Sequence, residues 1–375
     1  MKMKSKKYFS DIKELYKKLS AIPVVSGGEE AVYEDICDTV FGYTDFFDTC
    51  EQLPCGGMLF THHCGKENAK RIIFDAHLDT VGFCVTELLE GGFLRLRNIG
   101  GIDKRLLFAS DIEIYGKKTV KGVFVSTPPH LSKGKDKKDG LPDISEIYVD
   151  TGLSDEKMKE LISVGDLCGF PYSYTELLND NVCGRSMDDR ICAVSIIVAA
   201  KMLEDSAEYA DGCDIIFSFS SAEELNGSGG AYLSRLCADA AIVMDVNFGR
   251  EKGVAEHESY ILGTGCGISY SSTTSRELTD ALVECAKKEN IPYNTVVETS
   301  STGTNAHYLS NCYLGTRCCV LSVPEKFMHA ANEVVDINDV YACAKLLCAF
   351  AKDFDGIYNK MNENKVIKPL PGGEI

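Results

Sequence analysis

Apolar runs of strand length alternate with helical patterns through most of this chain. Four short runs rich in Ile, Val, Phe and Cys are predicted to be buried strands, at residues 71–75, 214–219, 240–245 and 318–323. Helical periodicity is predicted at residues 186–203 and at 276–289, where apolar side chains recur on one face. This alternation is typical of an α/β fold, with a mixed sheet flanked by helices on both faces.

The stretch at about residues 84–178 has a different pattern. Glycines separate short strand-like runs at residues 92–97, 112–115 and 120–125. A length of 375 residues suits one large domain plus a smaller one. We therefore expect a small β-rich domain (84–178) inserted into a larger α/β domain, which residues 1–83 and 179–375 form together.

The charge balance of the chain argues against two classes of binding partner. The chain has 56 acidic and 39 basic residues, and its net charge of -17 repels nucleic acid and anionic membranes. We therefore expect neither as a partner. The lysine-rich stretch at residues 133–138 is interrupted by Gly134 and Asp136, and is predicted to be a solvated loop.

The cysteines and the N-terminal residues indicate in which cellular compartment the protein is located. The 17 cysteines are scattered, and several lie inside apolar runs, as in a protein with reduced thiols. Ile12, Leu15, Tyr16 and Leu19 have helical spacing, without the continuous apolar run of a signal peptide. The longest apolar stretch, near residues 191–200, is shorter than the ~20 residues of a membrane span. We expect a cytoplasmic protein.

Histidines and carboxylates cluster where the predicted strands end. Open α/β sheets bind their ligands at the carboxyl ends of strands. The candidate residues at or after these ends, or directly before the apolar helical run that starts near Ile191, are His77, Asp79, Asp188, Glu223, Glu224, Asp245 and His329. Each one alone is more often a helix cap or a surface residue. Together they suit zinc, cobalt or manganese, with carboxylates able to bridge two ions.

The adjacent pair Glu223 and Glu224 indicates the type of reaction. One carboxylate of such a pair can hold a metal ion while its neighbour takes a proton from an attacking water. The sequence therefore predicts a hydrolase with a dinuclear metal site.

Several motifs extend this prediction because they match a known family in order over nearly the whole chain. They are DAHLDTVGF (75–83), NIGGIDKRLL (98–107), PPHL (128–131), VCGRSMDDR (182–190), SAEELNGSGG (221–230), IVMDV (242–246) and MHAANEVVDINDV (328–340). With these motifs the chain resembles the tetrahedral, or glutamyl and deblocking, aminopeptidases. The resemblance implies an enzyme that hydrolyses N-terminal residues from peptide substrates.

The resemblance also implies a ligand set for two divalent ions, with zinc or cobalt the first expectation and manganese an alternative. Asp188 matches the carboxylate that bridges them. His77 and Asp245 match the remaining ligands of one ion, and Glu224 and His329 match those of the other.

Three further properties follow from the same resemblance. Glu223 matches the general base, and Asp79 matches the carboxylate that orients His77. The peptide bond between Asp188 and Asp189 is expected to be cis, as in relatives with this motif. The family commonly forms dodecamers, so we expect a homo-oligomer, either a dodecamer or a dimer.

The sequence departs from the family at a few positions. Thr80 replaces a usual Glu, which is closer to dinuclear deacylases and dipeptidases of the carboxypeptidase type, and this activity is our alternative. Asn305 replaces a usual Asp, His307 is unusual, and Ala330 follows His329 where a small hydroxyl residue is common. Asn305 and His307 are expected in a loop that approaches the substrate, so the preferred N-terminal residue stays open.

Overall fold

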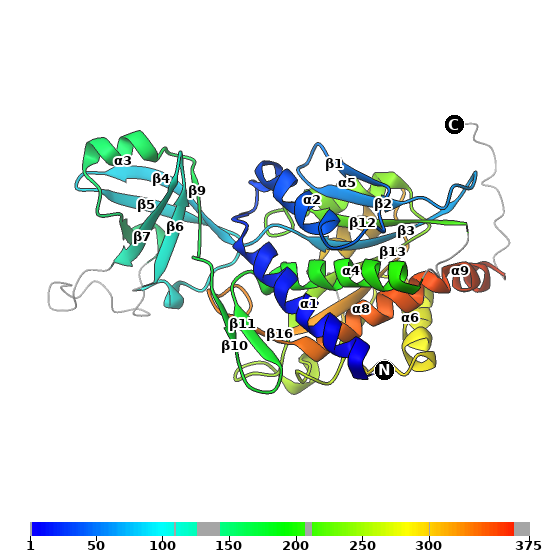
Figure 1. Cartoon of the computed structure of the whole chain (residues 1–375). Helices are drawn as coiled ribbons and strands as arrows, with labels where there is room; N and C mark the ends of the chain where they lie inside the picture. Colours follow the sequence, from blue (N-terminus) through cyan, green and yellow to red (C-terminus); the bar gives the residue numbers. More distant parts are fainter. Residues whose placement is uncertain (1, 109, 126–142, 207–211, 300, 364–375) are drawn as a thin grey trace.

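The computed structural model describes the chain except for residues 1, 109, 126–142, 207–211, 300 and 364–375. The predicted solvated loop at residues 133–138 and the PPHL motif at 128–131 lie outside the described residues. Figure 1 shows a small β-barrel joined to a larger lobe of sheet and helices.

The helices of the described part are α1 (Lys2–Ala21), α2 (Tyr33–Phe41), α3 (Asp155–Leu161), α4 (Met187–Ser206), α5 (Ser228–Leu233), α6 (Arg276–Lys288), α7 (Asn305–Asn311), α8 (Ile337–Lys352) and α9 (Phe354–Asn362), with the 3-10 helices η1 (Glu29–Val32), η2 (Lys104–Leu106), η3 (Ile144–Glu146), η4 (Ser234–Leu236) and η5 (Glu256–Glu258). The strands are β1 (Thr49–Gln52), β2 (Met58–His62), β3 (Lys70–His77), β4 (Gly82–Leu89), β5 (Phe93–Ile99), β6 (Asp111–Tyr115), β7 (Thr119–Val125), β8 (Tyr148–Asp150), β9 (Leu167–Gly169), β10 (Tyr174–Glu176), β11 (Asn181–Gly184), β12 (Cys213–Ser220), β13 (Ala240–Phe248), β14 (Cys266–Ser271), β15 (Tyr293–Glu298), β16 (Cys318–Lys326) and β17 (Glu333–Asp336).

The larger lobe is built on a mixed sheet of 11 strands in the order β1-β2-β12-β3-β13-β16-β17-β11-β10, with β14 joining β16 to β15. The four central strands β12, β3, β13 and β16 are parallel. Antiparallel strands extend the sheet on both sides of them. The predicted fold class is confirmed, and each of the four predicted strands lies within one of the central strands.

Helices cover both faces of this sheet because the central strands are apolar on both sides. On β3, Ile72 and Phe74 belong to the larger core, whereas Ile73 belongs to a second one. Such alternation follows from the two-residue period of a strand. Helices α1, α4 and α8 pack over the larger core, in front of the sheet in Figure 1, and α5 and α7 pack together on the second.

The inserted part is a closed barrel of β4, β5, β8, β7, β6 and β9. It has a hydrophobic core of its own, which includes Phe83, Leu94, Ile114 and Val149. Strand β10 falls within the predicted insert range but pairs with β11 in the large sheet. The domain ranges 1–83 with 179–375, and 84–178, stay a prediction.

Two smaller sequence expectations concern membranes and cysteines. Within the part of the chain that the structure describes, no helix has the length and apolarity that crossing a membrane requires. All the cysteines are free thiols, and Cys237 is the one exposed member of the set, the others being buried or partly buried.

We expect Phe217→Ala to destabilise the large domain strongly. Phe217 on β12 is fully buried, and its ring lies 5.0 Å from that of Phe47 and 5.2 Å from that of Phe74. Truncation leaves a cavity that costs about 3–5 kcal/mol of unfolding free energy, measurable by denaturant unfolding. As a control, Val164→Ala at a side chain that is 64% exposed should change this energy by less than about 0.5 kcal/mol. Equal effects of the two substitutions would contradict the expectation.

Candidate metal centre

Two neighbouring parallel strands deliver the first candidate residues to the same edge of the sheet. Strands β3 and β13 pair in register, with Asp75 opposite Val243. His77 and Asp245 each lie two residues further along, so they share one face of the sheet. Asp188 approaches them from the first turn of α4, where its backbone is not helical and the Asp188–Asp189 peptide bond is cis, as predicted.

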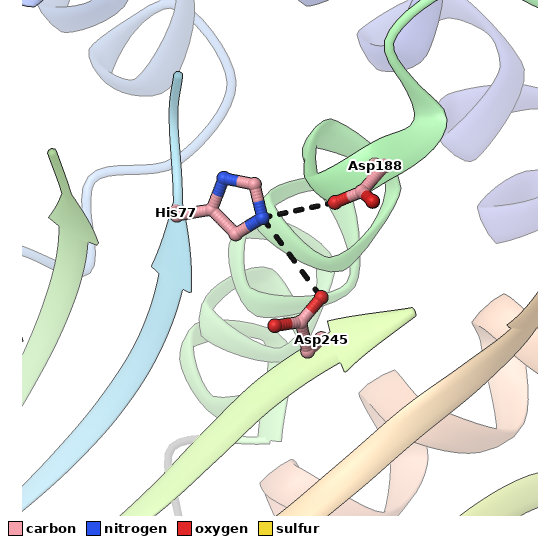
Figure 2. Close-up of side chains that lie close together, drawn as sticks. All are labelled: His77, Asp188 and Asp245. Carbon is pink, nitrogen blue, oxygen red and sulfur yellow. Dashed lines mark hydrogen bonds and ion pairs between the residues drawn. The ribbon is translucent and has the colours of Figure 1, made fainter. Parts of the chain in front are cut away.

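These three residues form a tight buried group, which Figure 2 shows. The Nε2 atom of His77 lies 2.9 Å from Asp188 Oδ1 and 3.8 Å from Asp245 Oδ1. All three side chains are buried. One ligand atom from each of them could contact a single cation, because these atoms all lie within 4.8 Å of one another.

A second group shares Asp188 with the first. His329 Nε2 lies 3.2 Å from Asp188 Oδ2 and 3.3 Å from Glu224 Oε1. The ligand atoms of Asp188, Glu224 and His329 also lie within 4.8 Å of one another. The two oxygens of Asp188 therefore face two different histidines, one in each group. This arrangement fits two cations bridged by one carboxylate.

The electrostatics of the two groups fit cations as well. Burial lowers the pKa of His329, but hydrogen bonds to Asp188 and Glu224 outweigh it and raise the pKa to about 11. Burial also raises the pKa of Glu223 to about 7, with the Asp188 and Glu224 carboxylates adding to the effect. In both cases the pKa is raised partly because negatively charged carboxylates are crowded in a buried space. Divalent cations would compensate this charge.

Asp79 links the two groups through the backbone as well as its side chain. Its backbone carbonyl lies 2.9 Å from His77 Nδ1 and accepts the proton of this nitrogen, which directs Nε2 towards Asp188. Its carboxylate accepts hydrogen bonds from the amides of Glu223, at 3.1 Å, and Glu224, at 3.2 Å. Ser26 donates a further hydrogen bond to it. Asp79 thus fixes both His77 and the segment that carries the paired glutamates.

Sequence reasoning missed a second residue that holds this segment. Glu29 is buried, and its carboxylate accepts hydrogen bonds from the amides of Ala222, at 2.8 Å, and Gly27, at 2.9 Å. Ala222 directly precedes the paired glutamates and has a positive φ of 55°. Because Glu29 follows a glycine-rich turn and belongs to no motif, its sequence context did not distinguish it from a surface acid.

Two of the residues that depart from the family pattern do not lie where we expected. Asn305 and His307 belong to helix α7 rather than to a loop. Asn305 is buried and donates hydrogen bonds to Ser220 Oγ, at 2.7 Å, and to Asp75 Oδ2, at 3.2 Å. The loop prediction failed because Thr304 caps this short helix, and seven residues are too few for a periodic pattern. Thr80 is buried and donates to the carbonyl of Val24.

The two groups open on a cleft of about 720 Å³. Its lining includes Asp188, Glu223 and His329 on one side and residues 301–304 on the other, directly before α7. This volume suits a small ligand or the end of a peptide.

Comparisons with known proteins agree with this geometry. The family model for the M42 glutamyl aminopeptidases matches residues 56–346. The lysyl aminopeptidase of Pyrococcus furiosus is 30% identical over 348 residues, which cover 91% of this chain and 96% of that protein. The chain therefore belongs to the M42 aminopeptidase family of metallopeptidases.

Solved structures have the same fold. The TET1 peptidase of Pyrococcus horikoshii, which can assemble into a tetrahedron or a large octahedral shell, superposes with a TM-score of 0.78 at 30% identity, covering 91% of this chain and 99% of that one. A TET aminopeptidase from a marine sediment Thaumarchaeota archaeon gives 0.85 at 23% identity, covering 94% and 99%. The family findings confirm the predicted metal-dependent aminopeptidase activity, and they do not favour the deacylase or dipeptidase alternative.

Proposed function

We propose that this enzyme removes single N-terminal residues from peptides at a site for two divalent ions. The observation that carries the proposal is the position of Asp188, whose two oxygens face His77 in one group and His329 in the other. His77 and Asp245 would complete one ion site, and Glu224 and His329 the other. Zinc or cobalt fits this set of nitrogen and oxygen donors best, and manganese is the alternative.

The bound ions would polarise the scissile carbonyl and make an attacking water more acidic. The residues of the chain perform the remaining steps. Glu223 borders the cleft beside Glu224, and its raised pKa of about 7 suits a group that takes a proton and then returns it. We assign it the role of general base, which delivers the proton to the leaving amine. Asp79 keeps Glu223 in place through its amide.

The charge of the cleft supports the restriction to N-termini. The free α-ammonium group of a peptide is the one cation that every substrate brings, and the carboxylates around Asp188 and Glu223 attract it. An internal peptide bond lacks this charge. We therefore propose that the substrate's free α-amino group sits against a metal ion or a nearby carboxylate, which positions the first peptide bond for attack.

Two further properties belong to the same proposal. The Pyrococcus horikoshii TET1 peptidase can assemble into a tetrahedron or a large octahedral shell, and the likeness to it supports a homo-oligomer here, either a dodecamer or a dimer. The free thiols, many of them buried, support a reducing and therefore cytoplasmic location.

A substrate panel tests the proposed function. The metal-free protein is reloaded separately with zinc, cobalt or manganese and assayed with aminoacyl-anilides and with N-acyl amino acids. We expect hydrolysis of the anilides with at least one metal, and none of an anilide whose α-amino group is acetylated. Faster hydrolysis of N-acyl amino acids than of anilides would instead establish a deacylase.

A further inference from the structure

Two cysteines outside the metal-binding groups lie in contact at one edge of the large sheet. Cys37 belongs to α2, and Cys50 belongs to β1, the edge strand. Their Sγ atoms are 3.0 Å apart. Both side chains are partly buried against the larger hydrophobic core. Neither cysteine is among the predicted site residues, and the mechanism proposed above uses neither.

The elements that carry these cysteines are held together by contacts on both sides of the pair. The hydroxyl of Tyr33, at the start of α2, donates a hydrogen bond to the carbonyl of Cys50, at 3.3 Å. On β1, the side-chain amide of Gln52 donates to the carbonyl of Glu30 in η1, at 3.1 Å. The two sulfurs are therefore kept near each other before any reaction. A disulfide bond is about 2.05 Å long, so its formation needs an approach of only about 1 Å.

Partial exposure distinguishes this pair from a second pair of neighbouring cysteines. Cys266 and Cys343 are both buried. Burial, and then the neighbouring Cys266 thiol, raises the pKa of Cys343 well above its usual value. A thiol that is protonated and screened from solvent reacts poorly. Cys37 and Cys50 are instead within reach of a small solute, so they are the pair that an oxidant would meet.

The charge around Cys37 and Cys50 favours an uncharged oxidant. The exposed residues Asp38 and Glu51 directly follow the two cysteines in the chain. Their carboxylates, together with the net charge of -17, repel anionic oxidants such as oxidised glutathione. Hydrogen peroxide is small and carries no charge. The surroundings of the pair therefore suit a peroxide.

The reaction consumes one hydrogen peroxide molecule for each disulfide. The Cys37 sulfur attacks one oxygen of the peroxide, which breaks the O–O bond and gives a sulfenic acid and water. The Cys50 thiol then attacks the Cys37 sulfur, loses its proton and displaces a second water. The thiols are thereby oxidised and the peroxide is reduced. Burial raises the pKa of Cys50 to about 12, although Tyr33 opposes the rise, so Cys50 remains a thiol and we assign the first oxidation to Cys37.

We propose that Cys37 and Cys50 form a reversible disulfide when the protein meets a peroxide, and that this bond stabilises the fold by linking α2 to β1. The bond restricts the unfolded chain between residues 37 and 50. It also acts beside the site, because α2 directly follows η1, whose Glu29 holds the amide of Ala222 next to the paired glutamates.

The experiment treats the full-length, zinc-loaded protein with hydrogen peroxide, since zinc itself has no redox chemistry. The amount of peroxide is the smallest that oxidises the exposed Cys237. Remaining thiols are alkylated, and unreduced peptides are identified by mass spectrometry. We expect a Cys37–Cys50 cross-link in at least about tenfold excess over a Cys266–Cys343 cross-link, because proximity acts only where the oxidant has access. Dithiothreitol should remove the cross-link.

Thermal unfolding of the same samples tests the stabilising effect. We expect the oxidised wild type to have a Tm about 3–6 °C above that of the reduced protein. Cys37→Ser should show no such rise after peroxide, whereas the matched control Cys312→Ser, at another partly buried cysteine, should respond as the wild type does. These variants separate the effect of the bond from that of methionine oxidation.

Three results would overturn the inference. The first is that Cys37 and Cys50 are recovered as thiols, or as separately oxidised sulfurs, once Cys237 has been oxidised. The second is a cross-link that leaves the Tm unchanged or lowers it. The third is an equal rise in Tm for Cys37→Ser, which would place its cause elsewhere in the chain. Both measurements are independent of peptide hydrolysis, so a failure of the proposed function would not affect them.

Discussion

Glu223→Gln is expected to keep about two metal ions per chain while kcat falls by about 100-fold or more. Glutamine has nearly the shape of glutamate but cannot take a proton from water. The hydrogen bond from the residue 223 amide to Asp79 involves only the backbone of residue 223 and should persist. Metal content by mass spectrometry of the element and kcat with an aminoacyl-anilide measure the two effects separately.

The neighbouring residue provides the control for this prediction. Glu224 Oε1 lies 3.3 Å from His329 Nε2 in the second group, so Glu224→Gln should release metal as well as activity. If Glu223→Gln lost metal and Glu224→Gln retained it, the assigned roles of the two glutamates would have to be exchanged.

Removal of the metal ions is expected to abolish activity without unfolding the chain. The residues that would bind them include His77 on β3, Asp245 on β13 and Asp188 in the first turn of α4, and all three elements are anchored in the larger hydrophobic core. The fold therefore does not depend on the ions, unlike that of a zinc finger, which unfolds when its metal is removed. We also expect a lower Tm for the metal-free protein, because ligands that bind only the folded state stabilise it by mass action.

Circular dichroism, light scattering and activity, recorded on the same chelated sample, test this expectation. Helical signal should persist while activity is lost, and added zinc, cobalt or manganese should restore activity. Light scattering separates dissociation of an oligomer, which is compatible with the prediction, from unfolding. A fall in helical signal parallel to the loss of activity would refute it.

The central fold was predictable because the strands that form it are buried on both faces. Apolar runs such as residues 240–245 mark strands clearly, and the first polar residues after them lie at the edge of the sheet where ligands bind. The same reasoning predicts from the amino-acid pattern alone that His77 and Asp245 lie at one edge of the sheet. The assignment of these residues as metal ligands stays a prediction.

Other parts of the structure were not predictable because their contacts are remote in sequence or their elements are short. The hydrogen bond between Glu29 and Ala222 joins residues 193 positions apart, and nothing local to either residue indicates it. Strands β10, β11 and β17 have three or four residues each, too few to show a period. They are stabilised by pairing with one another and with β16 rather than by an apolar run of their own.

The anchoring of three site residues by Asp79 has a consequence for how such enzymes can change. Asp79 ties His77, Glu223 and Glu224 together, so a substitution that moves one of these groups disturbs the others. These residues are therefore expected to be inherited as a unit, because a change in one of them calls for compensating changes in the others.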